Sequence, residues 1–550
     1  MFVEHHLYFA RAKTQQLRKE EIIPKRGNIY DRKGRELAIS LEKESLFIDP
    51  SSLRSDEKIR ILKNYIKINI EQIKSYSEKN VRFLWLERKL DHEVAEKIKA
   101  LKIEGLGFIP EGARFYPNGF LASHVIGFVN IDDQGIEGLE KQYDKYLRVE
   151  KSLKVVSVDA KGKRLSDGNL KDIKGNDIFI TIDEGLQYIV EKYLEEAVRK
   201  WQASSGTVIM MDPFTGEILA LANRPTYDPN NLKLIKNIGV IRNRALTDLY
   251  EPGSTFKIVT ATAALEEGIV NLRTKFDCSQ GYIEIWGKKI KDAHRNGVLT
   301  FEEVIQKSSN VGTIKIAMML GKEKLYHYIK KFGFGEKTGI DLPGEVAGYV
   351  RPPNKWSGTS IGAIPIGQEV AVTPIQVLRA YAAIANGGYL VKPFVVSEIR
   401  SPEGKILYKA VIQRERIISE KTAKTMRDIL KKVTQEGGTA TQAKIDGNDV
   451  AGKTGTAQKY DPKTGRYSKD KFVSSFVGFI PADNPRIAMI VVIHDPKGAH
   501  YGGVVAAPVF KAISHEALAY LNVPRDDAKE KGLFVRLENE TNRKVVVAKE

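Results

Sequence analysis

Three short stretches in the second half of the chain carry residues that could perform acyl transfer. They are Ser254-Thr255-Phe256-Lys257, Ser308-Ser309-Asn310 and Lys453-Thr454-Gly455-Thr456, in that order. A serine hydroxyl is a weak nucleophile until a neighbouring base takes its proton, and a lysine kept neutral can be that base. The stretches therefore predict a serine acyltransferase in which lysine replaces the histidine of other serine enzymes.

The sequence around the first stretch separates it from chance matches. Similar patterns occur elsewhere, at Ser40, Ser55, Ser468, Lys337 and Lys463. Those matches lie in polar or turn-rich surroundings, whereas Ser254 follows a Pro-Gly turn and opens an apolar helical run over 256–265. We therefore place the Ser254 oxygen at a helix N-terminus, where unpaired N–H groups favour negative charge. Lys257 lies one turn further on the same face, so its amine is expected to reach the hydroxyl.

The third stretch lies in a strand-like segment with small residues on both sides. Val450-Ala451-Gly452 precedes Lys453 and Ala457 follows Thr456. We expect these small residues to let a substrate backbone lie against the strand.

The composition describes a globular chain with a large positive charge. Of its 550 residues, 42% are hydrophobic and 28% are charged, and the net charge is +18. This length exceeds one hydrophobic core, so we expect two or three domains. The basic residues are spread through helices such as 56–67 and 140–151, without the aromatic-interleaved basic motif of nucleic-acid binders. The charge therefore favours an anionic membrane surface or wall polymer, and we expect no nucleic-acid partner.

The single cysteine and the nine histidines predict no disulfide, metal or cofactor. Cys278 has no partner for an internal disulfide and no evident base nearby, so we interpret it as structural. The histidines show no paired metal-ligand spacing.

The pattern of elements predicts two main units. We expect a juxtamembrane remnant over 1–21, a first unit over 22–165, a linker over 166–182, a second unit over 183–523 and a charged tail over 524–550. The first unit begins with strand, turn and strand over 24–38, and the remnant is expected to be a polar helix. No run of eighteen apolar residues occurs, so the sequence contains no membrane-spanning candidate, and a truncated anchor is our interpretation.

The second unit has the pattern of an α+β fold. A helix over 183–201 precedes a hairpin around Pro213-Phe214-Thr215-Gly216, and a helical block follows over 254–390. The remaining expected elements are strands at 450–457, 472–480 and 487–494 and a final helix over 506–521. We expect these helices to cover an antiparallel sheet.

Together, these features resemble a class B penicillin-binding protein, a monofunctional peptidoglycan D,D-transpeptidase. The likeness covers about 22–521 and includes Arg26-Gly27-Asn28-Ile29-Tyr30-Asp31-Arg32 and the stretch from Gly367 to Gln376. Glu251-Pro252-Gly253-Ser254 and Ser308-Ser309-Asn310-Val311-Gly312 resemble the division-specific branch, which builds the septum. The resemblance implies an α+β transpeptidase domain, with an antiparallel sheet between helices, on an elongated N-terminal pedestal.

The resemblance also implies a reaction. Ser254 would attack the penultimate carbonyl of a peptidoglycan stem peptide that ends in D-Ala-D-Ala, and D-Ala would leave. An amine of a neighbouring stem peptide would then attack the acyl-enzyme and form the crosslink. Lys257 would be the base, with a pKa lowered by burial and by Lys453, and Ser308 would pass the proton to the leaving amine.

Substrate binding is implied for the remaining motif residues. The amide of Asn310 suits the substrate backbone and also Lys257. The terminal carboxylate would be bound by Lys453 and the hydroxyls of Thr454 and Thr456, and Gly455 would be a further substrate-binding residue. As in the family, the backbone N–H groups of Ser254 and Thr456 would form the oxyanion hole.

The implied partners and location follow from the family. The ligands would be stem peptides, the lipid-linked precursor and β-lactams. The protein partners would be a polytopic glycosyltransferase and other division proteins. Members are held in the cell inner membrane by one helix, with the body in the periplasm. We expect the hairpin from Arg26 to Gly34 to dock the glycosyltransferase, or else only to brace the two units.

Two further functions remain open on the motifs. One is a hydrolase, either a D,D-carboxypeptidase or a β-lactamase, in which water is the acceptor. The large first unit and the absence of a Glu-x-x-Leu-Asn deacylation motif count against it. The other is a non-catalytic β-lactam-sensing scaffold, against which the intact Ser254, Lys257 and Lys453 argue.

Overall fold

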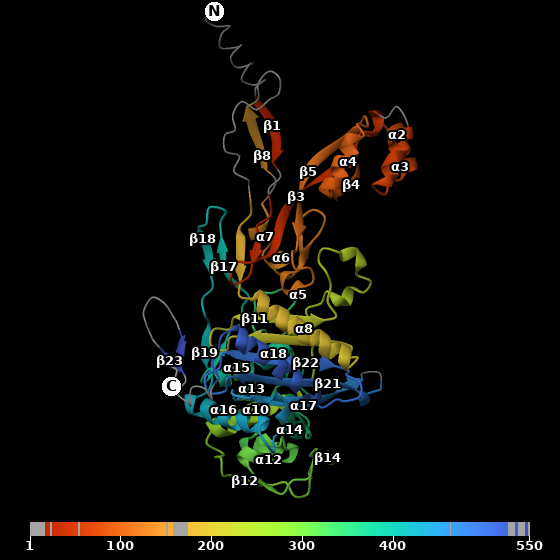
Figure 1. The fold of residues 1–550 in the computed structure, drawn as a ribbon. Coiled ribbons are helices and arrows are strands. Elements are labelled where there is room, and N and C mark those ends of the chain that lie inside the picture. The colour runs from red at the N-terminus through yellow and green to blue at the C-terminus, as the bar shows by residue number, and fades with distance from the viewer. Residues whose placement is uncertain are drawn as a thin grey trace, which may run out of the picture.

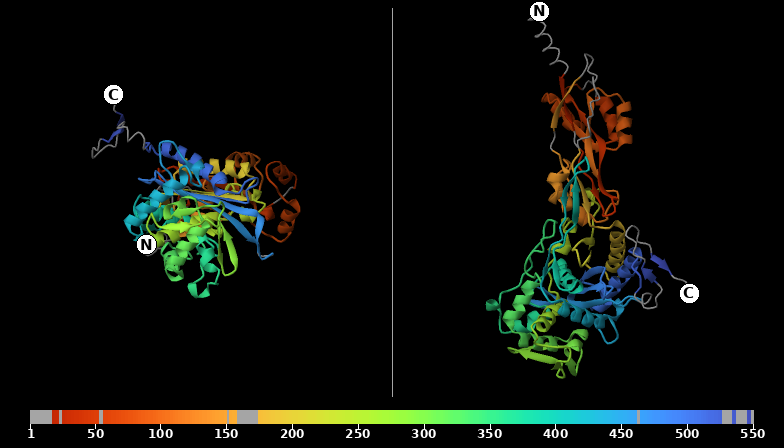
Figure 2. Two further views of the ribbon diagram at one scale, coloured as in Figure 1. Left: turned by 90° about the horizontal axis from the view of Figure 1, so that it is seen from below. Right: turned by 90° about the vertical axis from the view of Figure 1, so that its left-hand side faces the viewer.

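The molecule is a narrow pedestal of strands joined to a larger body of helices and strands (Figure 1). The computed structural model describes residues 17–22, 25–52, 56–149, 152–157, 174–461, 464–525, 534–536 and 545–547. The right-hand view of Figure 2 shows the same elongated arrangement, with the red and orange N-terminal part at one end. The predicted α+β class with a pedestal is confirmed.

The body is built on a five-stranded antiparallel sheet of order β11-β10-β22-β21-β20. Its strands are β10 (Ser205–Met211), β11 (Ile218–Arg224), β20 (Ala451–Asp461), β21 (Arg466–Ile480) and β22 (Ile487–His494). Every residue of β10, β11 and β22 is buried, so both faces of the sheet are covered. The expected hairpin and the three C-terminal strands are confirmed, and β20 and β21 extend further than predicted.

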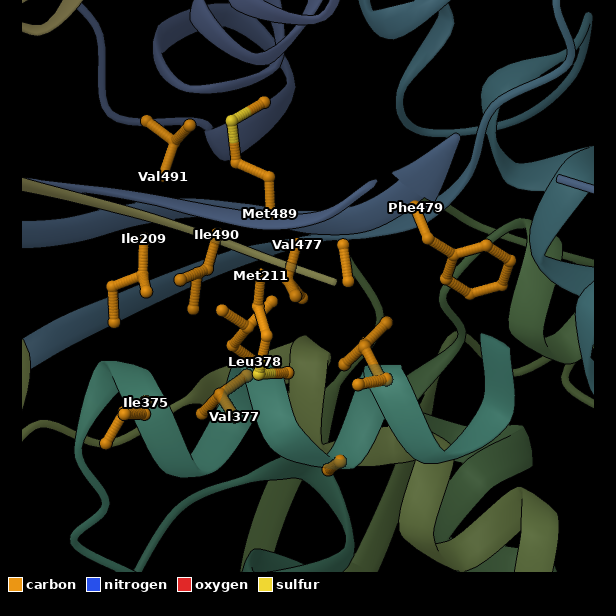
Figure 3. Packing of buried hydrophobic residues seen from close by; sticks show 14 of the residues in the cluster. Ile209, Met211, Ile375, Val377, Leu378, Val477, Phe479, Met489, Ile490 and Val491 are labelled. Carbon is orange, nitrogen blue, oxygen red and sulfur yellow. The ribbon is translucent and has the colours of Figure 1, made fainter. Parts of the chain in front are cut away.

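Helices cover both faces of this sheet. One face packs against α8 (Glu184–Lys200) and α18 (Ala507–Tyr520), and the other against α15 (Pro374–Ala385). Figure 3 shows Ile490 and Val477 pointing toward Leu378 of α15, while Met489 and Val491 point to the opposite side. Each such aliphatic side chain contributes about 1.5–3 kcal/mol by leaving water.

The helical block holds the residues of the first two motifs. Its main elements are η5 (Gly253–Phe256), α10 (Lys257–Glu266), α11 (Phe301–Gln306), α12 (Asn310–Leu320) and α13 (Lys322–Lys331). Four short strands interrupt it, which the predicted helical block did not include: β12 (Lys275–Asp277), β13 (Tyr282–Ile285), β14 (Lys288–Lys291) and β15 (Val298–Thr300). The turn between β13 and β14 needs positive φ at Trp286 and Gly287, which ends any helix there.

The pedestal sheet is shared between the two halves of the chain. Its order is β18-β17-β9-β2-β3-β4, and β5 also pairs with β3. The N-terminal strands are β2 (Ile29–Tyr30), β3 (Glu36–Ile48), β4 (Leu84–Leu90) and β5 (Leu106–Phe115). They are joined by β9 (Asp177–Ile180), β17 (Val396–Arg400) and β18 (Ile406–Lys409). The expected linker thus contains a strand, and the N-terminal unit lacks part of its sheet without the body.

The outer end of the pedestal carries three helices on the long β3 and β5 strands. They are α2 (Asp56–Ile61), α3 (Ile70–Glu78) and α4 (His92–Ala100). These elements have a small hydrophobic core of their own, which includes Leu46, Leu62, Ile73 and Ile98.

The N-terminal residues differ from the prediction where they are described. Instead of a polar helix, residues 17–22 form β1 (Leu17–Ile22), which pairs antiparallel with β8 (Ser152–Ser157). The partner strand supplies the backbone hydrogen bonds that a helix would make internally, and this overrides local helix propensity. Residues 1–16 lie outside the described residues, as does most of the tail. Among the residues that are described, no helix has the length and apolarity needed to cross a bilayer.

Arg26 and Asp31 of the hairpin over 26–34 are buried, whereas residues 32–36 around its turn are exposed. Arg26 is 4% exposed and Asp31 is fully buried. Arg26 Nε donates to Glu140 Oε2 at 2.6 Å, and Arg114 Nε donates to Glu140 Oε1 at 2.6 Å. Asp31 Oδ2 accepts the N–H of Glu184, the first residue of α8, at 3.2 Å. These contacts favour the brace interpretation over docking for these two side chains.

Candidate active site

Ser254 lies in a tight turn that leads directly into α10. The preceding Gly253 has φ of 56°, and its N–H donates to the carbonyl oxygen of Gly367 at 3.2 Å. A Cβ on Gly367 would lie 2.2 Å from the Gly253 oxygen, so only glycine permits this approach. Tyr381 OH donates to the carbonyl of Thr255 at 2.9 Å and fixes the turn from inside. Ser254 is therefore held rigidly and partly exposed at the start of a helix, as the sequence predicted.

Lys257 is completely buried behind Ser254. Its Nζ donates to the Ser308 carbonyl at 2.6 Å, to Ser308 Oγ at 3.3 Å and to Asn310 Oδ1 at 2.8 Å. These three contacts use all the hydrogens of an ammonium group. Within the described residues no hydrogen bond joins it to Ser254, contrary to the expected contact. Loss of one proton would free a lone pair on Nζ for the Ser254 hydroxyl.

Lys453 approaches the Ser308 hydroxyl from the sheet. It is completely buried on β20, and its Nζ donates to Ser308 Oγ at 2.9 Å and to the Thr454 carbonyl at 3.4 Å. The Ser308 hydroxyl therefore lies between two lysine side chains from different elements. This position agrees with the proton-transfer role predicted for Ser308.

Both lysines have lowered pKa values. Burial lowers the pKa of Lys257 to about 7, and the negative charge of Asp292 opposes this change. Burial, and then the charge of Lys257, hold the pKa of Lys453 well below its usual range. The predicted direction for Lys257 is thus correct, with burial as the leading cause. A neutral amine is consequently available at neutral pH.

The second motif is held in a strained turn. Ser308 has φ of 57°, a left-handed conformation that costs a non-glycine residue about 1–2 kcal/mol. Ser309 caps α12 by accepting the N–H of Gly312 at 2.9 Å. Asn310 Nδ2 donates to the Lys291 carbonyl at 2.8 Å, so its amide is held at both ends. Asn310 also lines the cleft, and the contact of its amide with substrate stays a prediction.

Sequence reasoning missed Asp292. Its Oδ1 accepts the N–H groups of Asn310 at 2.5 Å and Val311 at 3.0 Å, and its Oδ2 accepts Ser309 Oγ at 2.8 Å. Asp292 directly follows β14 in an exposed, basic segment, and no local pattern marks it. Only the fold brings it to the N-terminus of α12.

Some residues of the third motif line the cleft, and others are packed in the interior. Thr454 and Thr456 line the cleft, but Gly455 does not. A Cβ on Gly455 would lie 2.4 Å from Ser475 Oγ and 2.9 Å from the carbonyl oxygen of Pro252. Gly455 thus lets β20 pack against the turn that carries Ser254, and its contact with substrate stays a prediction. The Thr456 hydroxyl accepts the N–H of Gly502 at 3.0 Å.

These residues open into a single cleft of about 860 Å³. Ser254, Ser308, Asn310, Thr454 and Thr456 lie along it, with further walls at 437–442 and 500–504. Such a volume is large enough for the end of an extended peptide. Lys257 and Lys453 lie behind the lining, in contact with it through Ser308.

The mouth of the cleft is tied to the end of the sheet by an acidic residue. Glu251 Oε1 accepts Tyr467 OH at 3.1 Å and the N–H of Glu369 at 2.8 Å. Burial raises the pKa of Glu251. Tyr467 extends from β21, so this contact fixes the β20–β21 hairpin beside Ser254.

Cys278 and a cluster of ligand-type side chains in the pedestal do not line the cleft. Cys278 is buried, and burial raises its pKa, so it remains a thiol as expected for a structural cysteine. In the part of the chain that is described, ligand-type side chains gather at Glu44, His92 and Glu96 of the pedestal. Lys99 already pairs with Glu44 at 2.6 Å and with Glu96 at 2.8 Å there.

Comparisons with known proteins agree with this geometry. Residues 206–515 match the penicillin-binding protein transpeptidase domain, and residues 21–180 match the penicillin-binding protein dimerisation domain. The chain is 38% identical over 533 residues to stage V sporulation protein D of Bacillus subtilis, covering 94% of this chain and 82% of that protein. It is 35% identical over 522 residues to peptidoglycan D,D-transpeptidase FtsI of Escherichia coli, covering 93% and 86%.

A solved structure extends the likeness to three dimensions. Penicillin-binding protein 3 of Mycobacterium tuberculosis, complexed with aztreonam, is 29% identical and superimposes with a TM-score of 0.72. The superposition covers 92% of this chain and 98% of that one.

Proposed function

Because the chain belongs to the class B penicillin-binding proteins of the FtsI type, we propose that it is a serine-type peptidoglycan D,D-transpeptidase and a target of β-lactams. The observation that carries this proposal is the pair of buried lysines joined by the Ser308 hydroxyl, directly behind Ser254. We propose Ser254, Lys257, Ser308, Asn310 and Lys453 as the catalytic residues.

Acylation begins with neutral Lys257. Its Nζ takes the proton of Ser254 Oγ, and Oγ attacks the penultimate carbonyl of the D-Ala-D-Ala end. The tetrahedral intermediate collapses, the C–N bond breaks, and Ser254 holds the ester. The proton passes from Lys257 through the Ser308 hydroxyl to the leaving D-Ala amine. Ser308 can donate one proton as it accepts another, so no charge is left behind.

Crosslinking reverses these proton transfers. The amine of a neighbouring stem peptide attacks the ester and gives one proton to the Ser308–Lys257 pair. The C–O bond then breaks, a new amide forms, and Ser254 Oγ regains a proton. The same residues therefore serve both half-reactions.

Substrate binding is proposed for the residues that line the cleft. The hydroxyls of Thr454 and Thr456 face the terminal carboxylate, and the Asn310 amide faces the peptide backbone. The N–H groups of Ser254 and Thr456 are proposed to bind the developing oxyanion. Lys453 is fully buried, so it acts on the substrate through Ser308 and by its charge rather than by direct exposure.

The cellular process, location and partner are proposed from the substrate. We propose that the protein acts in septal wall synthesis, on lipid-linked or nascent peptidoglycan at the periplasmic side of the inner membrane. A membrane glycosyltransferase that polymerises the glycan is the partner this reaction needs. We also propose that the chain divides near 166–182, with the pedestal before and the transpeptidase domain after it.

Two assays test the function together. The purified protein is first labelled with fluorescent penicillin, and then incubated with lipid-linked precursor and a glycan polymerase. We expect crosslinked muropeptides with wild type and none with Ser254→Ala. Release of tetrapeptide without crosslinks would instead identify a D,D-carboxypeptidase. Labelling without any turnover of stem peptide would identify a sensor.

A further inference from the structure

Asp292, which no motif contains, contacts three consecutive residues of the second motif and its helix. Its two oxygens accept the Ser309 hydroxyl and the N–H groups of Asn310 and Val311. The adjacent carbonyl of Lys291 accepts the Asn310 side-chain amide at 2.8 Å. The end of β14 therefore holds the motif from outside the cleft.

These contacts fix the direction of two catalytic groups. A carboxylate at the start of α12 satisfies N–H groups that the helix leaves unpaired and interacts favourably with its dipole. With its backbone and amide both held, Asn310 presents Oδ1 to Lys257 Nζ at 2.8 Å. The same anchoring stabilises the left-handed backbone of Ser308, whose hydroxyl joins the two lysines.

Asp292 is also the negative charge that faces the base. The charged group that acts on the pKa of Lys257 is Asp292, at the end of β14, while Lys257 in turn lowers the pKa of Lys453 on β20. Cys278 packs near Asp292, while His294 and Lys307 lie further along the cleft wall. Burial disfavours the protonated form of Lys257, and the charge of Asp292 favours it.

We propose that Asp292 is a positioning residue for acylation, which fixes the Ser308–Asn310 turn against Lys257 and lets Lys257 hold the proton that it takes from Ser254. This inference rests on the proposed function. A base whose conjugate acid is too weak accepts the proton of Ser254 poorly. A carboxylate close to Lys257 counteracts the burial that would otherwise weaken the base.

The test separates charge from hydrogen bonding. The full chain is compared with Asp292→Asn, which keeps an acceptor oxygen but no charge, and Asp292→Ala, which keeps neither. The second-order rate of acylation by fluorescent penicillin is measured from pH 5.5 to 9, with the melting temperature alongside. Asp277→Asn is the matched control, because Asp277 is exposed in the same subdomain and faces Cys278 rather than Lys257.

The expected result for Asp292→Asn is a near-normal melting temperature and a plateau rate about tenfold lower. Its rising pH limb should move to lower pH, because Lys257 loses the charge that favours its protonated form. For Asp292→Ala we expect a loss of about 10²-fold and a lower melting temperature. Asp277→Asn should match wild type. Ser309→Ala removes one contact of Asp292 and leaves its charge. The rising part of the pH–rate profile of this variant should therefore not move.

An unmoved limb in Asp292→Asn, with a rate within about twofold of wild type, would overturn the inference. So would a moved limb in Ser309→Ala, a result that remains measurable even if the Asp292 variants fail to fold. If wild type itself is not labelled, or if labelling survives Ser254→Ala, the proposed function fails instead.

Discussion

Lys257 and Lys453 donate to one and the same oxygen, Ser308 Oγ, at 3.3 and 2.9 Å. Two buried ammonium groups on one hydroxyl repel each other and lack water, so the pair readily gives up a proton. The shared hydroxyl can accept from one amine and donate to the other. This relationship places a base, Lys257, one turn after Ser254. It also gives the proton of that base a path through the Ser308 hydroxyl.

The first prediction concerns the base. Lys257→Ala should lower the rate of penicillin acylation by about 10²-fold or more, the usual scale for loss of a general base. Because the pKa of Lys257 is about 7, the wild-type rate should rise between pH 6 and 8 and then level off. Lys424→Ala, an exposed change on α16 (Glu420–Thr434), is the control and should follow wild type. A wild-type limb that keeps rising to pH 10 would contradict the lowered pKa.

The same pKa predicts how stability depends on pH. The pKa of Lys257 is about 7 in the folded chain and near 10.5 when unfolded, so the unfolded state binds more protons between these values. Stability from this group is therefore lowest below pH 7 and increases as the pH rises. The free energy of unfolding of wild type, relative to Lys257→Met, should increase by about 1.4 kcal/mol per pH unit from 7.5 to 9. Urea titrations at each pH measure it, and a flat difference would refute the assignment.

Ser308 offers a matched pair of changes. Ser308→Ala and Ser308→Gly both remove the hydroxyl between the lysines, so both should lower acylation by about 10- to 100-fold. Only glycine relieves the left-handed backbone at φ of 57°. The free energy of unfolding of Ser308→Gly should consequently be about 1 kcal/mol higher than that of Ser308→Ala, as measured by urea titration. Equal stability of the two variants would mean that the turn stores no strain.

Arg26 should affect stability and not chemistry. Arg26→Ala leaves Glu140 buried with only Arg114 as its cationic partner, and we expect a loss of about 3–5 kcal/mol. Acylation per folded molecule should stay within about twofold of wild type because the network lies in the pedestal. Arg32→Ala breaks an exposed pair with Glu217 and should cost under about 1 kcal/mol. Normal melting of Arg26→Ala together with lost stimulation of a glycan polymerase would restore the docking interpretation.

Local sequence predicted the parts of the fold that local physics determines. The helix after Asp183 begins where that side chain accepts the N–H groups of Gly185 and Leu186. The apolar run 487–493 became a fully buried strand, β22. The turn before Ser254 was predictable because Pro252 and Gly253 permit little else.

What the sequence did not reveal depends on contacts between distant segments. Strands β17 and β18 belong to a sheet whose other strands come from the N-terminal half of the chain. No residue pattern in 396–409 indicates that these strands pair with β9. Asp292 lies 16 positions before Ser308 in a basic segment, where a lone carboxylate gives no pattern. The sequence likewise cannot show that Ser475 and Pro252 approach Gly455 closely, which is why its packing role was not predicted.

The most direct test of the account is the site of covalent penicillin attachment. The full chain is incubated with penicillin and digested, and the adduct is located by tandem mass spectrometry. We predict one adduct, on Ser254, which disappears in Ser254→Ala and forms more slowly at pH 6 than at pH 8. An adduct on another residue, or undiminished labelling of Ser254→Ala, would contradict the account.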